Sequence, residues 1–391
     1  MSDRAAPGGI ESVRRRNLAT VLGLVHVHGP RSRAQLTHAT GLNRSTVAAL
    51  VAELSERGLV LEREPAPTDK VGRPSPLVTI NPAVCAVAVN PEVDCLTVAV
   101  VGLDGQITAR ERIEADQPLT AEQTTAAVAR IIDQWGTGPL AGAQVLGVGM
   151  AVPGLVRADE GVVVQAPHLH WHDVAIGDQI EAATGLPVAV GNDANLGALA
   201  EHLFGAGVGC DDLLYVNGGP SGIGAGVLVG GRVVTGAGGF AGEIGRIRLA
   251  IPESTGWRAA TGMLEDEVNR VRLLQEVDVV AADESALAAA IAESDSSQLR
   301  AEQARQCELL ASALANAANL LNPSLIIVGG FLATIAGDDL SQLRQALARQ
   351  AVPAIAENLE LREAALGQGR LLIGAAEVAF GRLLADPTSA L

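Results

Sequence analysis

The sequence predicts an α/β protein in two unequal parts, a small basic helical module and a large acidic body. The first observation is charge. Residues 1–75 hold 11 Lys and Arg against 7 Asp and Glu, whereas the whole chain of 391 residues has a net charge of −16. The second is pattern, because apolar runs of strand length alternate with helical segments and glycine turns from residue 83 onward. A chain of this length exceeds one ordinary core, so we expect separate domains over 1–80 and 83–391.

Three helices are predicted in the N-terminal module. Apolar residues at helical spacing mark the first, over residues 12–28. The segment RSRAQLTHATGL predicts a short second helix that closes at Gly41. Asn43 is a good N-cap for the third, over 44–57, and Gly58 ends it.

The segment LVLEREPAPTDKVGRPSPLVTI follows, and it is typical of two strands around a tip of proline and basic residues. Two helices joined by a glycine turn and followed by such a hairpin resemble the winged helix-turn-helix domain of bacterial regulators. In that motif the start of the second helix meets base edges in the DNA major groove, which indicates Arg44, Ser45 and Thr46. Arg73, in the wing, is expected to enter a minor groove.

The body begins with AVCAVAVNPEVDCLTVAVVGLDG, two predicted strands that meet at a turn. Strand and glycine-loop units follow, in VLGVGMAVPGLV, PVAVGNDAN and LLYVNGGPSGIGAGVLVGGRVV. The chain has neither a run of eighteen or more apolar residues nor a signal-like start. We therefore expect a cytoplasmic protein with no membrane partner.

Four segments resemble, in order and spacing, the ROK family of sugar kinases and sugar-responsive repressors: GVGMAVPGLV, LPVAVGNDANLGALAEHLFGAG, GIGAGVLVGGRVVTGAGGFAGEIG and NLLNPSLIIVGG. The likeness covers nearly all of residues 83–391, and the winged module ahead of it is typical of the repressor branch. The resemblance implies an actin-like body of two α/β lobes around a cleft. It also implies a homodimer or homotetramer whose partners are operator DNA and a sugar or sugar derivative.

The resemblance assigns the sugar site to Gly154, Asn192, Asp193, Glu243 and Glu265. Their chemistry suits a hydroxyl-rich ligand, because carboxylates accept, amides donate and accept, and glycine lets the backbone approach. In the family's kinases, the Asp at the position of Asp193 is a general base. Two plainer interpretations stay open: an Asn-Asp pair is often a helix cap, and two glutamates are often surface charges.

One family element needed for phosphoryl transfer is altered. The kinases carry a DxGGT-like phosphate loop at the first hairpin of the body, where this chain has Asn90-Pro91-Glu92-Val93-Asp94. The proline lacks an N–H, the valine replaces a glycine, and the glutamate places negative charge where phosphate would bind. We therefore expect no catalytic residue and no cofactor, with Asp193 retained for sugar binding.

The family's zinc hairpin is altered as well. Counting from Glu243, the four ligand positions hold Arg246, Gly256, Arg258 and Met263, so no structural zinc is expected. The sequence thus predicts a DNA-binding regulator, most simply a repressor, that senses a sugar in a degenerate kinase-like cleft. Two alternatives stay open: an active sugar kinase, and an effector-free regulator controlled by a protein partner.

Overall fold

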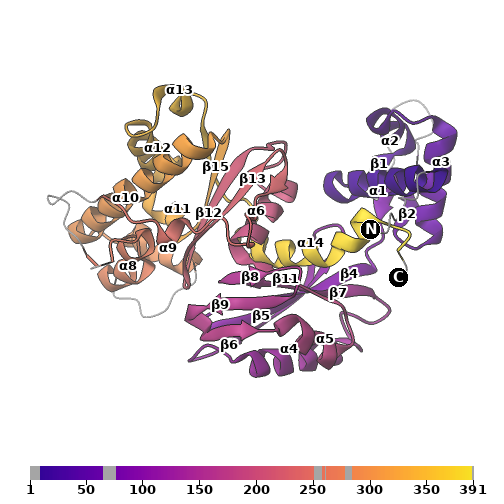
Figure 1. Ribbon diagram of the computed structural model, residues 1–391, viewed down its shortest axis with the longest axis horizontal. Coiled ribbons are helices and arrows are strands. Elements are labelled where there is room, and N and C mark those ends of the chain that lie inside the picture. The colour runs from indigo at the N-terminus through magenta and orange to yellow at the C-terminus, as the bar shows by residue number, and fades with distance from the viewer. Residues whose placement is uncertain (1–8, 65–75, 251–257, 260, 278–283, 390–391) are drawn as a thin grey trace, which may run out of the picture.

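The structure is a computed structural model that describes residues 9–64, 76–250, 258–259, 261–277 and 284–389. Figure 1 shows the N-terminal module, in indigo, beside two α/β lobes. The strands of one lobe are purple and magenta, and the helices of the other are mainly orange. Within the described ranges, no helix has both the length and the apolar composition needed to cross a membrane.

The N-terminal module has three helices and a sheet of order β1-β3-β2: α1 (Ile10–His28), β1 (Arg31–Ser32), α2 (Arg33–Thr40), α3 (Arg44–Glu56), β2 (Val60–Arg63) and β3 (Leu77–Ile80). Ser32 begins α2 with a capping box, and Gly41 ends it in the left-handed conformation, with φ at 68°. Asn43 begins α3 by accepting the Thr46 N–H. The predicted helices and hairpin strands are confirmed, whereas the hairpin tip, with Arg73, lies outside the described residues.

The first lobe is built on a mixed sheet of order β11-β7-β4-β5-β6: β4 (Val84–Pro91), β5 (Cys95–Gly102), β6 (Ile107–Glu114), β7 (Gln144–Val152) and β11 (Val188–Asn192). β4 and β5 are buried along their whole length, which explains their unbroken apolar sequences. Figure 1 shows two helices below this sheet, α4 (Ala121–Trp135) and α5 (Ile176–Thr184). A small sheet accompanies it: β8 (Leu155–Arg157), β9 (Val162–Ala166) and β10 (Trp171–Val174), with the short helix η1 (Pro167–Leu169).

The second lobe has a mixed sheet of order β14-β13-β12-β15-β16: β12 (Leu213–Gly219), β13 (Gly222–Val229), β14 (Arg232–Val233), β15 (Leu325–Gly330) and β16 (Glu360–Glu363). Its other elements are helical: η2 (Ile244–Arg246), α7 (Leu264–Glu267), α8 (Arg270–Glu276), α9 (Glu284–Glu293), α10 (Ser297–Leu321), α11 (Phe331–Ile335), η3 (Asp338–Leu340), α12 (Ser341–Ala348), α13 (Pro353–Ala356) and η4 (Gly367–Gly369). α10, α11 and α12 share one buried apolar cluster with β12, β13 and β15.

Two helices, α6 (Asp193–Phe204) and α14 (Arg370–Ala385), pack against each other and join the lobes. α6 lies on β12 and β13, and α14 lies on β4 and β7. Glycine permits the close packing of α14 on both neighbours. A Cβ at Gly374 would lie 2.1 Å from the Leu196 carbonyl oxygen of α6, and one at Gly149 of β7 would lie 1.7 Å from the Ala375 carbonyl oxygen of α14. Two mixed sheets joined by central helices confirm the predicted two-lobed α/β body.

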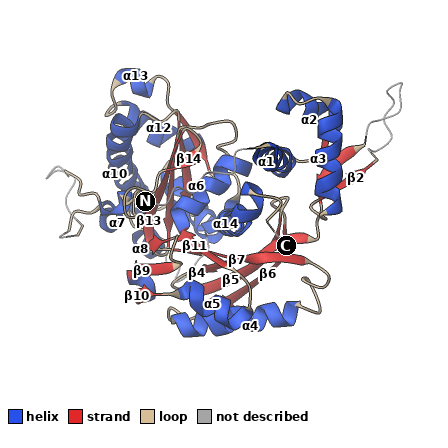
Figure 2. Ribbon diagram, turned by 45° about the vertical axis from the view of Figure 1, so that its right-hand side comes forward, coloured by secondary structure: helices blue, strands red, loops and turns tan. Residues whose placement is uncertain are grey.

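The N-terminal module is packed onto the body, not merely tethered to it. Both Figure 1 and Figure 2 show α1 beside α14. Leu18 and Leu22 of α1 belong to the same buried apolar cluster as Leu372 and Phe380 of α14. Only residues 81–83 separate β3 of the module from β4 of the first lobe. The same buried apolar cluster continues from the module into that lobe.

Candidate functional site

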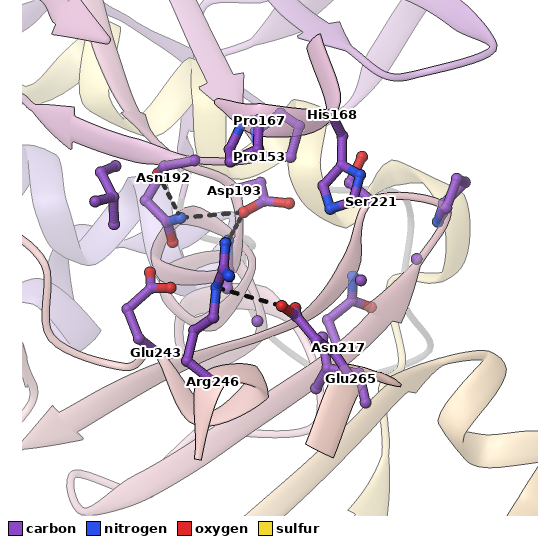
Figure 3. Close-up of a pocket in the computed structure, with 18 of the residues that line it drawn as sticks. Pro153, Pro167, His168, Asn192, Asp193, Asn217, Ser221, Glu243, Arg246 and Glu265 are labelled. Carbon is purple, nitrogen blue, oxygen red and sulfur yellow. Dashed lines mark hydrogen bonds and ion pairs between the residues drawn. The ribbon is translucent and has the colours of Figure 1, made fainter. Parts of the chain in front are cut away.

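A cavity of about 390 Å³ lies between the two lobes. Its walls come from the β4–β5 turn, the segment after β7, the junction of β9 and η1, the start of α6, the β12–β13 turn, η2 with the residues just before it, and α7. All five residues that the resemblance assigns to a sugar line it: Gly154, Asn192, Asp193, Glu243 and Glu265. Figure 3 shows the three carboxylates arriving from separate segments around one space.

Asn192 is both a helix cap and a cavity residue. Its Oδ1 accepts the Asn195 N–H at 3.0 Å, which caps α6. Its Nδ2 donates to the Gly154 carbonyl at 3.0 Å and to Asp193 Oδ1 at 3.2 Å. Because its polar atoms are already paired, Asn192 orients Asp193 and connects α6 to the Gly154 turn. The helix-cap interpretation is therefore correct for Asn192, but it does not exclude a place in the site.

Asp193 is half-buried at the start of α6, with its carboxylate directed into the cavity (Figure 3). Its Oδ1 accepts the Ala194 N–H at 2.8 Å, whereas its Oδ2 accepts no hydrogen bond from the described residues. Burial raises the pKa of Asp193 to about 7, and the negative charges of Glu92 and Glu243 act in the same direction. Asp193 therefore titrates near neutral pH with one oxygen available to a ligand.

Gly154 occupies a position where only a hydrogen atom fits. A Cβ there would lie 2.5 Å from the carbonyl oxygen of Gln165 and 2.8 Å from the Cβ of Ala166. The close approach of the two backbones requires glycine. It brings the carbonyl of Gly154 to the Asn192 amide at the edge of the cavity.

The segment at the altered metal hairpin is closed by an ion pair. The Nε of Arg246 lies 3.3 Å from Oε1 of Glu265 (Figure 3). An antiparallel bridge between Arg248 and Met263 pairs the two arms of the hairpin. Arg246, at one family ligand position, therefore neutralises one cavity carboxylate, while Glu243 stays exposed in the opening.

Behind the cavity, Glu267 ties the same hairpin to α10. Its side chain is fully buried and accepts the backbone N–H groups of Arg258 and Ala259, each at 2.9 Å. It also forms an ion pair with Arg305 of α10, whose side chain is only 8% exposed. Two other positions of the hairpin, Gly256 and Trp257, lie outside the described residues. Among the described residues, Glu267 thus holds together the two ends of the altered loop.

The altered phosphate element lies between two cavities. A second cavity, of about 660 Å³, shares Glu92, Gly219 and Pro220 with the first. Burial raises the pKa of Glu92, and the charges of Asp94 and Glu284 raise it further. Four arginines also line the second cavity: Arg110, Arg112, Arg270 and Arg370. Two of the four are already paired with carboxylates of the same wall, so a phosphate would meet both signs of charge there.

Sequence reasoning missed three polar residues of the first cavity: Gln165, His168 and Asn217. His168 lies on η1 and is exposed, as is the neighbouring His170. The run HLHWHD, with three histidines at alternate positions, is the signal in the sequence for this polar segment. Asn217 lies near the end of β12, directly before two glycines.

The expected DNA-contacting residues lie in the first turn of α3. Arg44 and Ser45 are exposed, whereas Thr46 is half-buried. The hydroxyl of Ser45 donates to Oδ1 of Asn43 at 2.7 Å, so it supports the helix cap as well as facing outward. Arg44 makes no hydrogen bond or ion pair with any described residue, and its guanidinium is therefore free to bind an acceptor outside the chain.

Two protein families match the chain, one over the two-lobed body and one over the N-terminal module. The ROK family matches residues 87–381, and the MarR family matches residues 18–70. The first match spans the two lobes and the second spans most of the N-terminal module.

Individual relatives include both regulators and kinases. The chain is 27% identical over 378 residues to a xylose repressor of Bacillus subtilis, covering 95% of this chain and 97% of the repressor. It is 33% identical over 249 residues to a glucokinase of Halalkalibacterium halodurans, covering 59% of this chain and 74% of the kinase. The crystal structure of a ROK family transcriptional regulator, a homologue of the E. coli MLC protein, has a TM-score of 0.74 and 25% identity, covering 95% of this chain and 97% of that one.

Proposed function

The chain belongs to the ROK family and is a transcriptional regulator of that family, and we propose that it represses by binding operator DNA and responds to a sugar or sugar derivative in the cavity between its lobes. The observation that carries the proposal is the convergence of five residues from separate segments on that cavity: Gly154, Asn192, Asp193, Glu243 and Glu265. Residues 1–80 bind DNA in this proposal, and residues 83–391 bind the effector and form a cytoplasmic homodimer or homotetramer.

The chemistry of the cavity supports a hydroxyl-rich ligand. Asp193 offers an oxygen with no partner among the described residues, and Glu243 and Glu265 face it across the space (Figure 3). A hydrogen bond to a charged group contributes about 1.5–3 kcal/mol. Removing one such bond would lower the affinity for the sugar about tenfold to a hundredfold, because about 1.4 kcal/mol corresponds to a factor of ten.

Coupling to DNA follows from the position of the cavity. A ligand that contacts both lobes favours their closed arrangement, because it interacts with the two states differently. The winged module packs on α14, which itself packs on α6 at the cavity. Closure would therefore change the separation of the two DNA-binding modules in a dimer, and with it operator affinity.

The glucokinase relative supports the competing function, an active sugar kinase. The hairpin of β4 and β5 argues against it, since Glu92 and Asp94 place two carboxylates where a nucleotide phosphate would lie. We propose that the chain transfers no phosphoryl group and binds no structural zinc. ATP turnover with any hexose in a coupled assay would contradict the absence of phosphoryl transfer. Stoichiometric zinc in the purified protein would contradict the absence of a zinc site.

The test combines a ligand screen with DNA binding. A thermal-shift screen of sugars and sugar phosphates identifies a ligand, because a ligand of the native state raises apparent stability by mass action. Operator affinity is then measured by fluorescence anisotropy for wild type, Asp193→Asn and Glu265→Gln, with and without that ligand. Both variants should keep operator binding and lose the sugar response.

An unchanged response in both variants would refute the assignment of the cavity. If no sugar stabilises the protein, the result favours an effector-free regulator controlled by a protein partner. The two failures are thus distinguishable, since the first concerns the residues and the second the existence of a sugar effector.

A further inference from the structure

A buried polar pair lies within the apolar contact between the N-terminal module and the body. His26 is in the last turn of α1 and Glu377 is in α14, and their side chains are 2% and 3% exposed. Phe204 of α6 and Phe380 of α14 meet the imidazole edge to face, with ring centroids 5.3 and 6.4 Å from it. The pair is therefore shielded from solvent by the same contact that places the module.

Both ring nitrogens of His26 face hydrogen-bond acceptors. Its Nδ1 lies 2.5 Å from the carbonyl oxygen of Leu103, and its Nε2 lies 3.0 Å from Oε2 of Glu377. A carbonyl only accepts, so Nδ1 must carry a hydrogen. The contact between Nε2 and Oε2 then needs a second proton, either on the imidazole or on the carboxyl group. Without that proton, a buried carboxylate faces a nitrogen lone pair and both are unsatisfied.

We propose that His26 and Glu377 form a proton-dependent clasp, which fixes the DNA-binding module against α14 while the shared proton is bound and releases it when that proton is lost. The clasp is a response to pH that is separate from the sugar response. The proton leaves to solvent as hydroxide or buffer base removes it, and no other bond changes.

The surroundings of the pair favour the protonated form. Burial opposes a charge on His26, but the hydrogen bond and negative charge of Glu377 outweigh it, with smaller contributions from the Leu103 carbonyl and Asp104. The pKa of His26 is therefore raised above its ordinary value of 6.5. α6 and the rest of the α14 contact present the rings of Phe204 and Phe380, which carry no charge.

The direction of the pH effect follows from linkage. A histidine with a raised pKa in the folded protein stabilises the contact fully below pH 6.5, its value when unfolded. That stabilisation is lost as the pH rises through the folded-state pKa. The module should consequently be held at mildly acidic pH and loosened at alkaline pH.

The substitution Glu377→Gln should keep the contact between α1 and α14 but remove its dependence on the shared proton. In Glu377→Gln the side-chain amide can donate to the unprotonated Nε2 of His26, while Nδ1 keeps its hydrogen bond to Leu103. The clasp of this variant needs no shared proton. Glu357→Gln is the matched control, because Glu357 is exposed on the second lobe and its carboxylate has no hydrogen bond or ion pair with the described residues.

The experiment uses the full chain with two measurements between about pH 6 and about pH 9. NMR of ¹³C-labelled histidine follows the His26 ring, assigned by its loss in His26→Gln. Hydrogen exchange follows the amides of α1, corrected for the intrinsic pH dependence of exchange. In wild type and Glu357→Gln, protection of α1 should fall by up to about tenfold per pH unit between pH 6.5 and the raised pKa of His26, where each opening releases one proton, and should level off above that pKa. Glu377→Gln should show no such fall.

Two results would overturn the clasp. The first is loss of the proton from His26 in wild type at or below pH 6.5, the ordinary value. The second is the same pH dependence of protection in wild type and Glu377→Gln. If Glu377→Gln does not fold, the wild-type titration decides by itself.

Discussion

At the scale of single residues, the environment decides what each side chain of the cavity can do. Asn192 and Asp193 are neighbours in sequence, yet the amide is fully engaged in capping α6 and holding Gly154, while the carboxylate keeps one oxygen free. Burial then moves the pKa of Asp193 to about 7, far from that of an exposed aspartate. The group proposed to bind the ligand and the residue that supports it are therefore distinguishable only through their contacts.

The first prediction concerns the pH dependence of sugar binding. The ionised carboxylate of Asp193 can accept hydrogen bonds from a ligand, and its pKa is raised to about 7. Affinity for the sugar found in the thermal screen should thus rise from about pH 6 to about pH 8 and then level off. Asp193→Asn should bind about tenfold to a hundredfold more weakly, without this rise. Calorimetric titration measures both, with the exposed Asp133→Asn as control. A flat wild-type profile would show that Asp193 does not titrate against the ligand.

The second prediction concerns DNA specificity. Arg44 is exposed at the start of α3, where a recognition helix meets base edges. Arg44→Ala should lose about 1–3 kcal/mol of discrimination at one base pair of the operator. Competition binding with operators changed one base pair at a time measures this, and Arg300→Ala on the second lobe should leave the pattern as in wild type. Equal weakening on all sequences would instead assign Arg44 to a phosphate.

At the scale of elements, α14 is the helix that contacts both lobes and the DNA-binding module. It packs on the first sheet, on α6 and on α1, so it touches both lobes and the DNA-binding module. Small residues make these contacts possible, and the buried length of α14 shows few polar groups. Because α14 packs on all of them, a movement of the lobes would reach the module through this helix.

The third prediction compares two glycines of α14. A Cβ at Gly374 would lie 2.1 Å from the Leu196 carbonyl oxygen, whereas one at Gly381 would meet nothing within 4 Å. Gly374→Ala should destabilise the protein by about 1–3 kcal/mol through overpacking. Gly381→Ala should be neutral, or stabilising by up to about 1 kcal/mol from helix propensity. Urea unfolding measures both, and equal effects would mean that α6 and α14 are not in close contact in solution.

The fourth prediction concerns the hairpin with the altered metal positions, between η2 and α7. Glu267 is buried, paired with Arg305 and bonded to two backbone N–H groups. Glu267→Gln should cost about 1.5–3 kcal/mol, because Arg305 would lose the ion pair with Glu267 and keep the longer one with Glu302, at 3.7 Å. The exposed Glu276→Gln is the control. A small loss in Glu267→Gln would indicate that the hairpin does not depend on this pair.

At the scale of the whole molecule, the DNA-binding module and the body share one apolar cluster, which contains residues of α3 and of α6, the helix that begins at the cavity between the lobes. The charge is distributed unevenly, because the N-terminal module is basic whereas the body is so acidic that the whole chain has a net charge of −16. The acidic body is repelled by DNA, which favours approach through the module.

The fifth prediction follows from thermodynamic reciprocity. If the sugar lowers operator affinity by some factor, operator DNA must lower sugar affinity by the same factor. Calorimetric titration of the sugar into free protein and into the operator complex measures one factor, and anisotropy measures the other. Asp193→Asn should abolish both together. Unequal factors at equilibrium would mean that the two binding reactions include a further species, such as a change of oligomeric state.

The sequence by itself determined the parts of the fold whose causes are local. Asn43 and Gly41 mark helix ends through their own hydrogen bonds and backbone angles, and the apolar runs of β4 and β5 indicate buried strands. The five assigned cavity residues were reachable through the family resemblance, because their motifs are short and contiguous. The change of charge at Glu92 was visible for the same reason.

Only the tertiary structure decided which distant groups meet. Arg246 and Glu265, Glu267 and Arg305, and His26 and Glu377 are pairs brought together from separate segments. His26 looks in sequence like an ordinary residue of an amphipathic helix, and nothing near it indicates a partner 351 positions away. The physical reason is that pairing, burial and a shifted pKa are properties of an environment assembled by folding, whereas helix caps, turns and strand patterns are written in neighbouring residues.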